Sequence, residues 1–309
     1  MKVMVTGASG FVGGEVLRTL SADRFDVRAT VRSPRPGMPG AMSIGAIDAD
    51  TDWSGALQGV ECVVHLAARV HVLQERAADP VAEFRTVNVE GTRRLAEAAV
   101  GAGVRRFIFV SSIGVHGAGG GLPISEMDPI APVTPYAASK ADAELALRMA
   151  AGSAMEVVVL RAPLVYGPTA PGNFARLVSL VARGVPLPFA SVRNERSVLG
   201  VTNLASAISL AARALDAAGE AFLVADSRVV SLTEMIAWIG EGLGRKPALW
   251  PVPPDLLRLG ASAFGRSREM EQLIGSLTVS TEKIVQMLGW RPPWQTGDAM
   301  RLAASSWRR

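Results

Sequence analysis

Short apolar runs alternate with alanine-rich stretches from the start of the chain to about residue 161. Short apolar runs bounded by turn residues indicate buried strands, and longer stretches with apolar positions three and four apart indicate helices. Strands are predicted at 2–6, 26–31, 43–47, 61–66, 105–110 and 156–161, and helices at 11–20, 80–102 and 135–151. Apolar strands that alternate with helices predict a Rossmann-like α/β fold, a doubly wound parallel sheet covered on both faces.

A glycine-rich turn joins the first predicted strand to the first predicted helix, with Gly7, Gly10 and Gly13 spaced by three. Glycines placed in this way permit a tight turn, let the backbone approach a pyrophosphate, and let the helix press on the strand. The helix N-terminus then offers free N–H groups to the phosphates. The turn, which also holds Ser9, Phe11 and Val12, is therefore a predicted dinucleotide site. The alternative is a glycine-rich turn that binds nothing.

The end of the second predicted strand bears on the choice of dinucleotide. An acidic residue there would accept a hydrogen bond from the ribose 2′-hydroxyl of NAD. This chain has Arg32 followed by Ser33, and a guanidinium beside a hydroxyl suits the 2′-phosphate of NADP. NADP(H) is therefore favoured over NAD(H), the alternative being a surface arginine in an enzyme that accepts either. Asp48 is a candidate partner of the adenine amino group, or else a loop carboxylate.

Beyond residue 165 the alternation weakens, and prolines at 168, 171, 186 and 188 interrupt it. A helix is predicted at 202–215, a strand at 221–225, and a helix to about 243 that begins with the capping box Ser231-Leu232-Thr233-Glu234. We therefore expect residues 1–165 and about 199–225 to form the dinucleotide-binding Rossmann domain. About 166–198 and 226–309 are expected to form a smaller mixed α/β C-terminal lobe that binds the substrate.

Tyr136 and Lys140 are the strongest candidates for chemistry. Thr134 is a candidate N-cap and Pro135 falls in the first turn, so both side chains are expected on one helix face. A nearby cation favours phenolate, which predicts a pKa for Tyr136 below its usual value of about 10. Such a phenol suits proton transfer near neutral pH. The alternative is an exposed helix whose lysine has no special role.

The composition narrows the classes of protein to which this chain can belong. The formal charge is +4, carried mostly by arginines that form no basic run and have no interleaved aromatics, so no nucleic-acid partner is expected. No apolar stretch approaches the roughly 20 residues that span a bilayer, and no signal peptide is apparent. A cytoplasmic protein without membrane insertion is therefore expected, with no metal site. Cys62, the single cysteine, lies in an apolar run and is interpreted as a core thiol.

Together these features resemble the extended short-chain dehydrogenase/reductase family. The resemblance rests on the loop at 6–13, the segment His65-Leu66-Ala67-Ala68, Asn88, the Ser111-Ser112 strand end, and Tyr136 with Lys140. It implies that Tyr136 is the general acid/base and that Lys140 holds the nicotinamide ribose. It also implies that Ser112 binds the same substrate oxygen as Tyr136, while the cofactor carries the hydride.

The resemblance implies further contacts. Leu66, Ala67 and Ala68 would line the cofactor cleft, Asn88 would hold structure or water near the lysine, and Pro163 would lie beside the nicotinamide. The segment 164–168 is similar to the sugar-nucleotide branch of the family, which implies that Asn173 and Arg196 bind a nucleotide diphosphate. The alternative role for Arg196 is a domain-closing ion pair.

Two departures from this branch affect the functional prediction. His116 stands where the branch commonly has tyrosine, and it either lines the sugar pocket or is simply packed. Ile113 and Gly114 follow Ser112, so the acid pair of the dehydratases is missing, which argues against dehydration. With His71 and the tail segments 266–277 and 288–290, the chain is most similar to reductases of UDP-4-keto-6-deoxy-N-acetylhexosamines.

The leading hypothesis is therefore an NAD(P)-dependent sugar-nucleotide oxidoreductase that reduces a 4-keto group of a UDP-sugar, with Tyr136 as the proton donor. A UDP-hexose 4-epimerase is the first alternative. A steroid- or flavonoid-type ketone reductase and a non-catalytic nucleotide-sensing protein are the others. The resemblance also implies a homodimer formed through the helices at 80–102 and 135–151.

Overall fold

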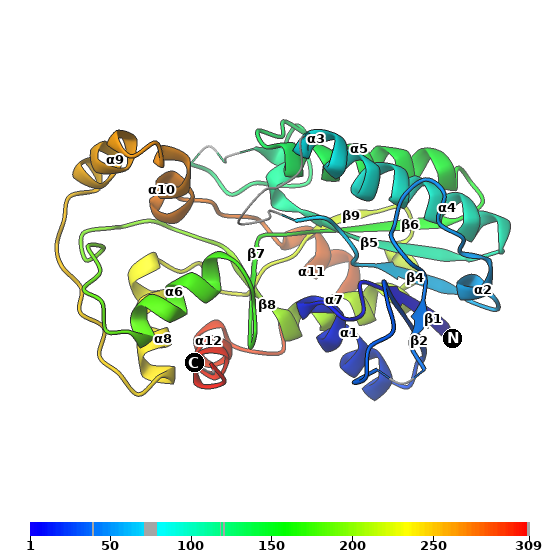
Figure 1. Ribbon diagram of the computed structural model, residues 1–309, viewed down its shortest axis with the longest axis horizontal. Helices are drawn as coiled ribbons and strands as arrows, with labels where there is room; N and C mark the ends of the chain where they lie inside the picture. The colour runs from blue at the N-terminus through cyan, green and yellow to red at the C-terminus, as the bar shows by residue number, and fades with distance from the viewer. Residues whose placement is uncertain (39, 71–78, 118, 120, 308–309) are drawn as a thin grey trace.

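The computed structural model describes residues 1–309 except 39, 71–78, 118, 120 and 308–309 (Figure 1). Its centre is a parallel sheet in the order β3-β2-β1-β4-β5-β6-β9. The strands are β1 (Lys2–Thr6), β2 (Asp26–Val31), β3 (Met42–Ser43), β4 (Cys62–His65), β5 (Arg106–Ser112), β6 (Glu156–Ala162) and β9 (Ala221–Leu223). The strand order reverses between β1 and β4, and the carboxyl ends of strands at such a switch point form the usual ligand crevice. The predicted doubly wound Rossmann-like sheet is confirmed.

Helices cover both faces of the sheet because successive strand residues point to opposite sides. On β1, Val3 and Val5 share a core with α1 (Phe11–Ala22) and α7 (Val201–Arg213). Met4, between them, faces the opposite core with α2 (Ser54–Leu57), α4 (Gly91–Gly101) and α5 (Pro135–Ala151). Figure 1 shows α4 and α5 above the sheet and α1 and α7 below it. Cys62 is buried in the first of these cores, and burial raises the pKa of its thiol to about 12. This environment agrees with a core thiol.

Several predicted boundaries are wrong. The third strand was expected at 43–47, but β3 holds only Met42 and Ser43, because its partner β2 ends at Val31. The single helix expected at 80–102 is α3 (Pro80–Phe84), a π-helical turn (Arg85–Glu90) and α4 in succession. Such π turns often carry functional residues. The helix predicted at 202–215 is α7, the strand at 221–225 is the shorter β9, and the capping box at Ser231 is confirmed.

The C-terminal part has a core of its own, which lies at the left of Figure 1. It consists of β7 (Leu164–Tyr166), β8 (Val198–Gly200), α6 (Asn173–Ala182), α8 (Leu232–Gly242), α9 (Pro254–Ala263), α10 (Ser267–Ile274) and α12 (Thr296–Ser305). The helix α11 (Glu282–Leu288) differs, because its Ile284 joins the core shared by α1 and α7. The proposed division into two domains remains a prediction.

A buried carboxylate joins the two parts. Asp226 accepts hydrogen bonds from the Tyr166 hydroxyl at 2.7 Å, from the Asn203 amide at 2.7 Å and from the Gly200 N–H at 2.9 Å. Burial raises the pKa of this carboxyl, and the three donors oppose the shift. Since buried polar groups need all their partners, this cluster fixes β7 and β8 of the lobe against α7 of the sheet domain.

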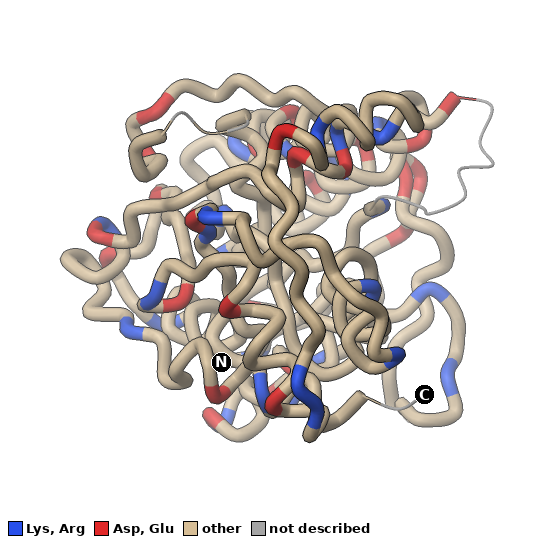
Figure 2. Tube along the Cα trace, turned by 90° about the vertical axis from the view of Figure 1, so that its left-hand side faces the viewer, with Lys and Arg blue, Asp and Glu red and all other residues tan. Residues whose placement is uncertain are grey.

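Charged side chains of both signs are mixed over the surface, and Figure 2 shows Lys and Arg interspersed with Asp and Glu along the trace. Within the described ranges, no helix combines the length and the apolar character needed to cross a membrane. The same ranges hold no cluster of three or more His, Cys, Asp or Glu side chains placed to bind a metal ion.

Candidate active site

The glycine turn leaves no room for side chains at the two positions that shape it. Gly7 has a φ of +66°, and a Cβ atom there would lie 2.8 Å from the backbone nitrogen of Ala67. A Cβ on Gly13 would lie 2.2 Å from the carbonyl oxygen of Gly7. Gly10 is the N-cap of α1 and has no side chain to occupy the first N–H groups of the helix. The turn therefore presents bare backbone donors, as a diphosphate site requires.

A cavity of about 540 Å³ lies beside this turn. Its wall includes Ser9, Gly10 and Phe11 from the turn, and Pro168 and Thr169 from the loop after β7. The glycine turn thus borders open space on the side of the lobe.

The end of β4 is fixed to the glycine turn by a buried chain of hydrogen bonds. The Thr6 hydroxyl accepts from the backbone N–H groups of Leu66 and Ala67, each at 3.2 Å, and lies 2.6 Å from His65 Nδ1. His65 Nε2 lies 3.1 Å from the Thr92 hydroxyl. Burial, followed by the charge of Lys140, lowers the pKa of His65 to about 3, so this histidine is neutral. The sequence predicted that residues 66–68 line the cleft but assigned no role to His65 or Thr92.

Asn88 connects this strand end to α5. Its amide Nδ2 donates to the Ser139 hydroxyl at 2.9 Å and to the Arg69 carbonyl at 3.0 Å. Its Oδ1 accepts from the Arg69 N–H at 2.7 Å. Ser139 in turn donates to the carbonyl of Tyr136 at 2.8 Å. Asn88 thus contacts Ser139, the residue before Lys140 on α5, and its role near the lysine stays a prediction.

Ser112 ends β5, whereas Tyr136 and Lys140 lie one turn apart near the start of α5. Thr134 caps the helix by accepting from the N–H of Ala137 at 2.9 Å. Ser112 accepts from the Gly114 N–H at 3.1 Å, and a Cβ on Gly114 would lie 3.3 Å from both the Ser112 hydroxyl and the Ala137 Cβ. The Ser112 turn is therefore packed against the helix turn that carries Tyr136.

Aromatic rings contact the side chains of Tyr136 and Lys140. The Tyr136 ring lies edge-on to Phe84 with 6.2 Å between centroids. The Lys140 ammonium lies 3.8 Å from the centroid of the Phe109 ring, a cation–π contact in a buried site.

The electrostatics differ from the sequence prediction. Burial raises the pKa of Tyr136 to about 12, whereas a value below the usual one was predicted. Burial also lowers the pKa of Lys140 to about 7, and Glu144 partly opposes this shift. The prediction was wrong because it counted the cation and omitted desolvation, which disfavours the charged form of both groups. At neutral pH the phenol is protonated, which is the form that donates a proton.

The other predicted cofactor-binding residues, which lie outside the glycine turn, differ in burial and in hydrogen bonding. Arg32 is exposed at the end of β2, and its carbonyl accepts from the Ser43 hydroxyl at 3.2 Å. The Oδ1 of Asp48 accepts from the N–H of Asp50 at 2.9 Å within a turn, as a loop carboxylate would. Pro163 is buried between β6 and β7.

The predicted substrate residues both lie in the lobe. Asn173 is the exposed first residue of α6. Arg196 donates from Nη1 to the carbonyl of Gly275 at 2.7 Å, and burial lowers the pKa of its guanidinium. In the described residues its partner is thus a carbonyl, and no ion pair that closes the domains is seen.

His116 is packed. Arg161 donates from Nη1 to His116 Nε2 at 2.9 Å, and His116 Nδ1 lies 3.3 Å from the carbonyl of Pro129. Both ring nitrogens therefore have protein partners, as the packed alternative required. His71, which contributed to the resemblance with the reductases, lies outside the described residues.

Comparison with known proteins agrees with this geometry. Residues 3–225 match the profile of the NAD dependent epimerase/dehydratase family. A UDP-glucose 4-epimerase of Vibrio cholerae is 38% identical, over 98% of this chain and 94% of that protein. An N-acetyl-alpha-D-glucosaminyl-diphospho-ditrans,octacis-undecaprenol 4-epimerase of Escherichia coli O157:H7 is 28% identical, over 85% of this chain and 78% of that protein. The crystal structure of the Thermus thermophilus UDP-glucose 4-epimerase in complex with NAD superposes with a TM-score of 0.77 at 26% identity, covering 99% of this chain and 98% of the other.

Proposed function

Because the chain belongs to the NAD-dependent epimerase/dehydratase family, we propose that it is a UDP-hexose 4-epimerase. The observation that carries this proposal is the packing of the Ser112 turn on the first turn of α5, the turn that contains Tyr136. The similarity to a UDP-glucose 4-epimerase over nearly the whole of both chains supports the choice of reaction.

The residues present suit a nicotinamide dinucleotide. A side chain at position 7 or 13 would collide with backbone, so the turn keeps its donors accessible. In this proposal the turn, with Ser9, Gly10, Phe11 and Val12, holds the diphosphate. The wall is formed by Leu66, Ala67, Ala68, Asn88 and Pro163. When bound, the nicotinamide supplies the hydride acceptor and donor.

The protein's own groups move and stabilise the proton. Once it has released its own proton, Tyr136 acts as a phenolate that takes the proton of the sugar 4-hydroxyl during oxidation and returns it during reduction. The Ser112 hydroxyl binds the same oxygen and holds it next to the phenol. Lys140 as an ammonium holds the ribose and stabilises the phenolate that forms when Tyr136 has given up its proton. In the lobe, Asn173 and Arg196 hold the nucleotide diphosphate, for which a guanidinium fork is well suited.

A second candidate is the reduction of a 4-keto UDP-deoxy-N-acetylhexosamine with NADP(H). It is favoured by Arg32, which stands exposed at the end of β2 where an NAD-binding acid would be expected. The substitution Arg32→Asp tests this preference, because it removes the cation and supplies an acceptor for a 2′-hydroxyl. If NADP(H) is the cofactor, the ratio of the dissociation constants for NADPH and NADH shifts towards NADH by about tenfold or more. An unchanged ratio contradicts the NADP preference.

The decisive experiment for the reaction uses the purified full chain with UDP-glucose and UDP-N-acetylglucosamine. A 4-epimerase returns the hydride to the same sugar, so the epimer forms without net consumption of cofactor. Consumption of NADPH by a 4-keto sugar nucleotide, with no epimer from either UDP-hexose, would instead favour the reductase. Tyr136→Phe is expected to lower turnover by about 10²-fold or more while cofactor still binds. Unchanged turnover in this variant would contradict the role given to Tyr136, and a wild-type protein that binds the dinucleotide but turns over no sugar nucleotide would favour a nucleotide-sensing protein.

We also propose a homodimer formed through α4 and α5. These helices pack side by side, and Leu145 and Met149 of α5 are 61% and 75% exposed. Light scattering at micromolar concentration tests this assembly, and a monomer mass contradicts it.

A further inference from the structure

Glu144 shares a face of α5 with the predicted catalytic residues. It lies one helical turn beyond Lys140 and two turns beyond Tyr136. The side chain is buried, and an unpaired carboxylate in such a place is strongly unfavourable. Arg161 on β6 provides the partner, with Nη2 2.6 Å from Oε2 and Nε 3.2 Å from Oε1 of Glu144. This is a two-point ion pair between a helix and a strand.

The ion pair also holds both ends of the segment that carries Ser112. At one end, the Ser111 hydroxyl donates to Glu144 Oε1. At the other end, Arg161 donates from Nη1 to His116 Nε2 at 2.9 Å. Between these two points lie Ser112 and the 3-10 turn Ile113–His116. The bonds thus fix this segment to α5 and β6 at the same time.

We propose that Glu144 and Arg161 are positioning residues for the reaction, which hold Ser112 in register with Tyr136 while Glu144 supplies the negative charge behind Lys140. The inference rests on the proposed function, because it takes Ser112, Tyr136 and Lys140 as the groups that do the chemistry. Neither Glu144 nor Arg161 touches the reacting atoms in this account.

Among the residues that the structure describes around Lys140, Glu144 is the charged group that favours the ammonium form. His65 from β4 is neutral, with a pKa of about 3, and β5 contributes the Phe109 ring. Glu144 is the charged residue that raises the pKa of Lys140 against the effect of burial. Glu144 itself is faced by Arg161, Ser111 and Lys140. His116, at the far side of Arg161, is faced by the backbone of Asp128 and Pro129.

Glu144→Gln in the full chain tests the proposal, because it removes the charge and keeps the shape. Loss of the fixed turn is expected to lower kcat by about tenfold to hundredfold, while KM for the sugar nucleotide stays within about twofold. Because the charge of Glu144 raises the pKa of Lys140, its removal lowers the pKa of that ammonium further. The pH–rate profile is therefore expected to shift to lower pH. Glu97→Gln is the matched control, since Glu97 lies on the exposed side of α4 and pairs with Arg93.

A folded Glu144→Gln protein with wild-type kcat and an unmoved pH profile overturns the proposal. A loss of kcat with an unmoved profile also overturns it, since a merely structural role gives that result. If the single variant does not fold, Glu144→Met with Arg161→Met removes both charges together, which proteins tolerate better than one lone buried charge. The kcat and the pH–rate profile of this double variant then decide whether the proposal holds. Tyr136→Phe separates the hypotheses: an active Tyr136→Phe protein rejects the proposed chemistry, whereas an inactive one with a normal Glu144→Gln protein rejects this inference alone.

Discussion

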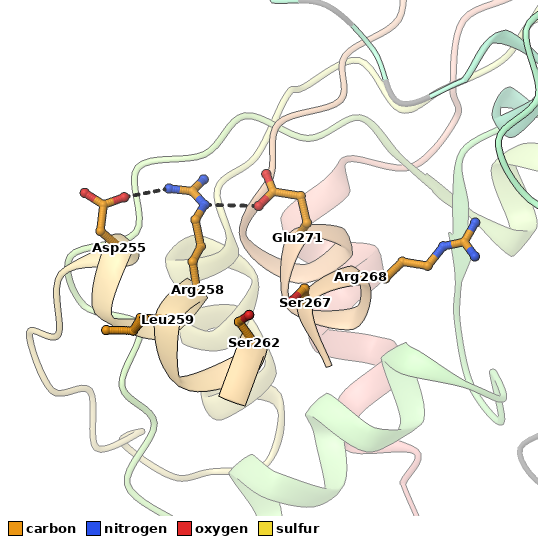
Figure 3. Close-up of a pocket in the computed structure, with 7 residues that line it drawn as sticks. All are labelled: Asp255, Arg258, Leu259, Ser262, Ser267, Arg268 and Glu271. Carbon is orange, nitrogen blue, oxygen red and sulfur yellow. Dashed lines mark hydrogen bonds and ion pairs between the residues drawn. The ribbon is translucent and has the colours of Figure 1, made fainter. Parts of the chain in front are cut away.

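The face of α5 and the α9–α10 hairpin use the same kinds of charged residue in opposite ways. At α5, Glu144 and Arg161 are each less than a tenth exposed, and every bond of the pair lies in the interior. In the hairpin, Arg258 reaches Asp255 at 3.2 Å and Glu271 at 3.1 Å, and all three side chains are exposed (Figure 3). Exposed pairs contribute little to stability, whereas breaking a buried pair leaves a costly lone charge.

The hairpin is also loosely filled. A cavity of about 640 Å³ lies between its helices, lined by Leu259 and Ser262 of α9 and by Ser267 of α10, among others (Figure 3). Figure 1 shows α9 and α10 at the end of the molecule away from β1 and β2. We therefore expect substitutions at the buried pair of α5 to affect the proposed reaction more than substitutions at the exposed pairs of the hairpin.

The largest effect is expected at the glycine turn. Gly13→Val would place a Cβ only 2.2 Å from the carbonyl oxygen of Gly7, which is a severe clash with backbone. Backbone cannot move aside cheaply, so cofactor binding should be lost and the melting temperature should fall. Gly14→Ala is the matched control on the same helix, because a Cβ there meets nothing within 4 Å and alanine favours helix by up to about 1 kcal/mol. Calorimetric titration with NAD and NADPH reads binding directly. Retained affinity in Gly13→Val contradicts the assignment of the turn.

The contrast between the two charged regions can be measured as stability. Glu144→Gln breaks a buried pair and should lower the free energy of unfolding by about 3 kcal/mol. Glu271→Gln breaks an exposed pair with Arg258 and should leave the denaturation midpoint unchanged. Urea unfolding of both variants decides the point. Equal decreases in the free energy of unfolding would show that the exposed pair of the hairpin contributes as much stability as the buried pair of α5.

Patterns that depend on neighbours in sequence were enough to predict the fold, the tight turn at Gly7 and Gly13, and the helix that carries Tyr136 and Lys140. The catalytic roles of Ser112, Tyr136 and Lys140 stay predictions. The alternation of apolar runs with helices predicted a parallel sheet covered on both faces, and the structure supplies its strand order. What failed was the pKa of Tyr136, which depends on how deeply the fold buries the ring and cannot be read from an i, i+4 spacing.

The supporting network was missed for the same reason. Glu144 and Arg161 are 17 positions apart, and their pairing exists only because β6 lies beside β5 under α5. One signal was present, namely that Glu144 continues the four-residue spacing of Tyr136 and Lys140. His65 and Thr92 likewise meet only in the tertiary structure.

A smaller effect is expected at Arg196. Arg196→Ala removes the guanidinium proposed to hold the nucleotide diphosphate, so KM for the UDP-sugar should rise by about tenfold with little change in kcat. Arg193→Ala is the control, since Arg193 is an exposed arginine three residues away. Steady-state kinetics with both variants separate the alternatives. A silent Arg196→Ala variant would favour a ketone reductase whose substrate lacks a diphosphate.

The smallest effect is expected at the hydrogen bond that joins α10 to the segment before α5. Arg268 of α10 donates from Nη2 to the carbonyl of Val133 at 2.8 Å, and Val133 immediately precedes the cap of α5, Thr134. Because this bond is exposed and a neighbouring water can replace it, Arg268→Ala should change kcat by no more than about twofold. A change in KM without a change in kcat would show that the contact orients the lobe towards the substrate. A tenfold loss of kcat would contradict the expected difference between the buried pair of α5 and the exposed bonds of the hairpin, because it would make this single surface bond part of the machinery that positions Tyr136.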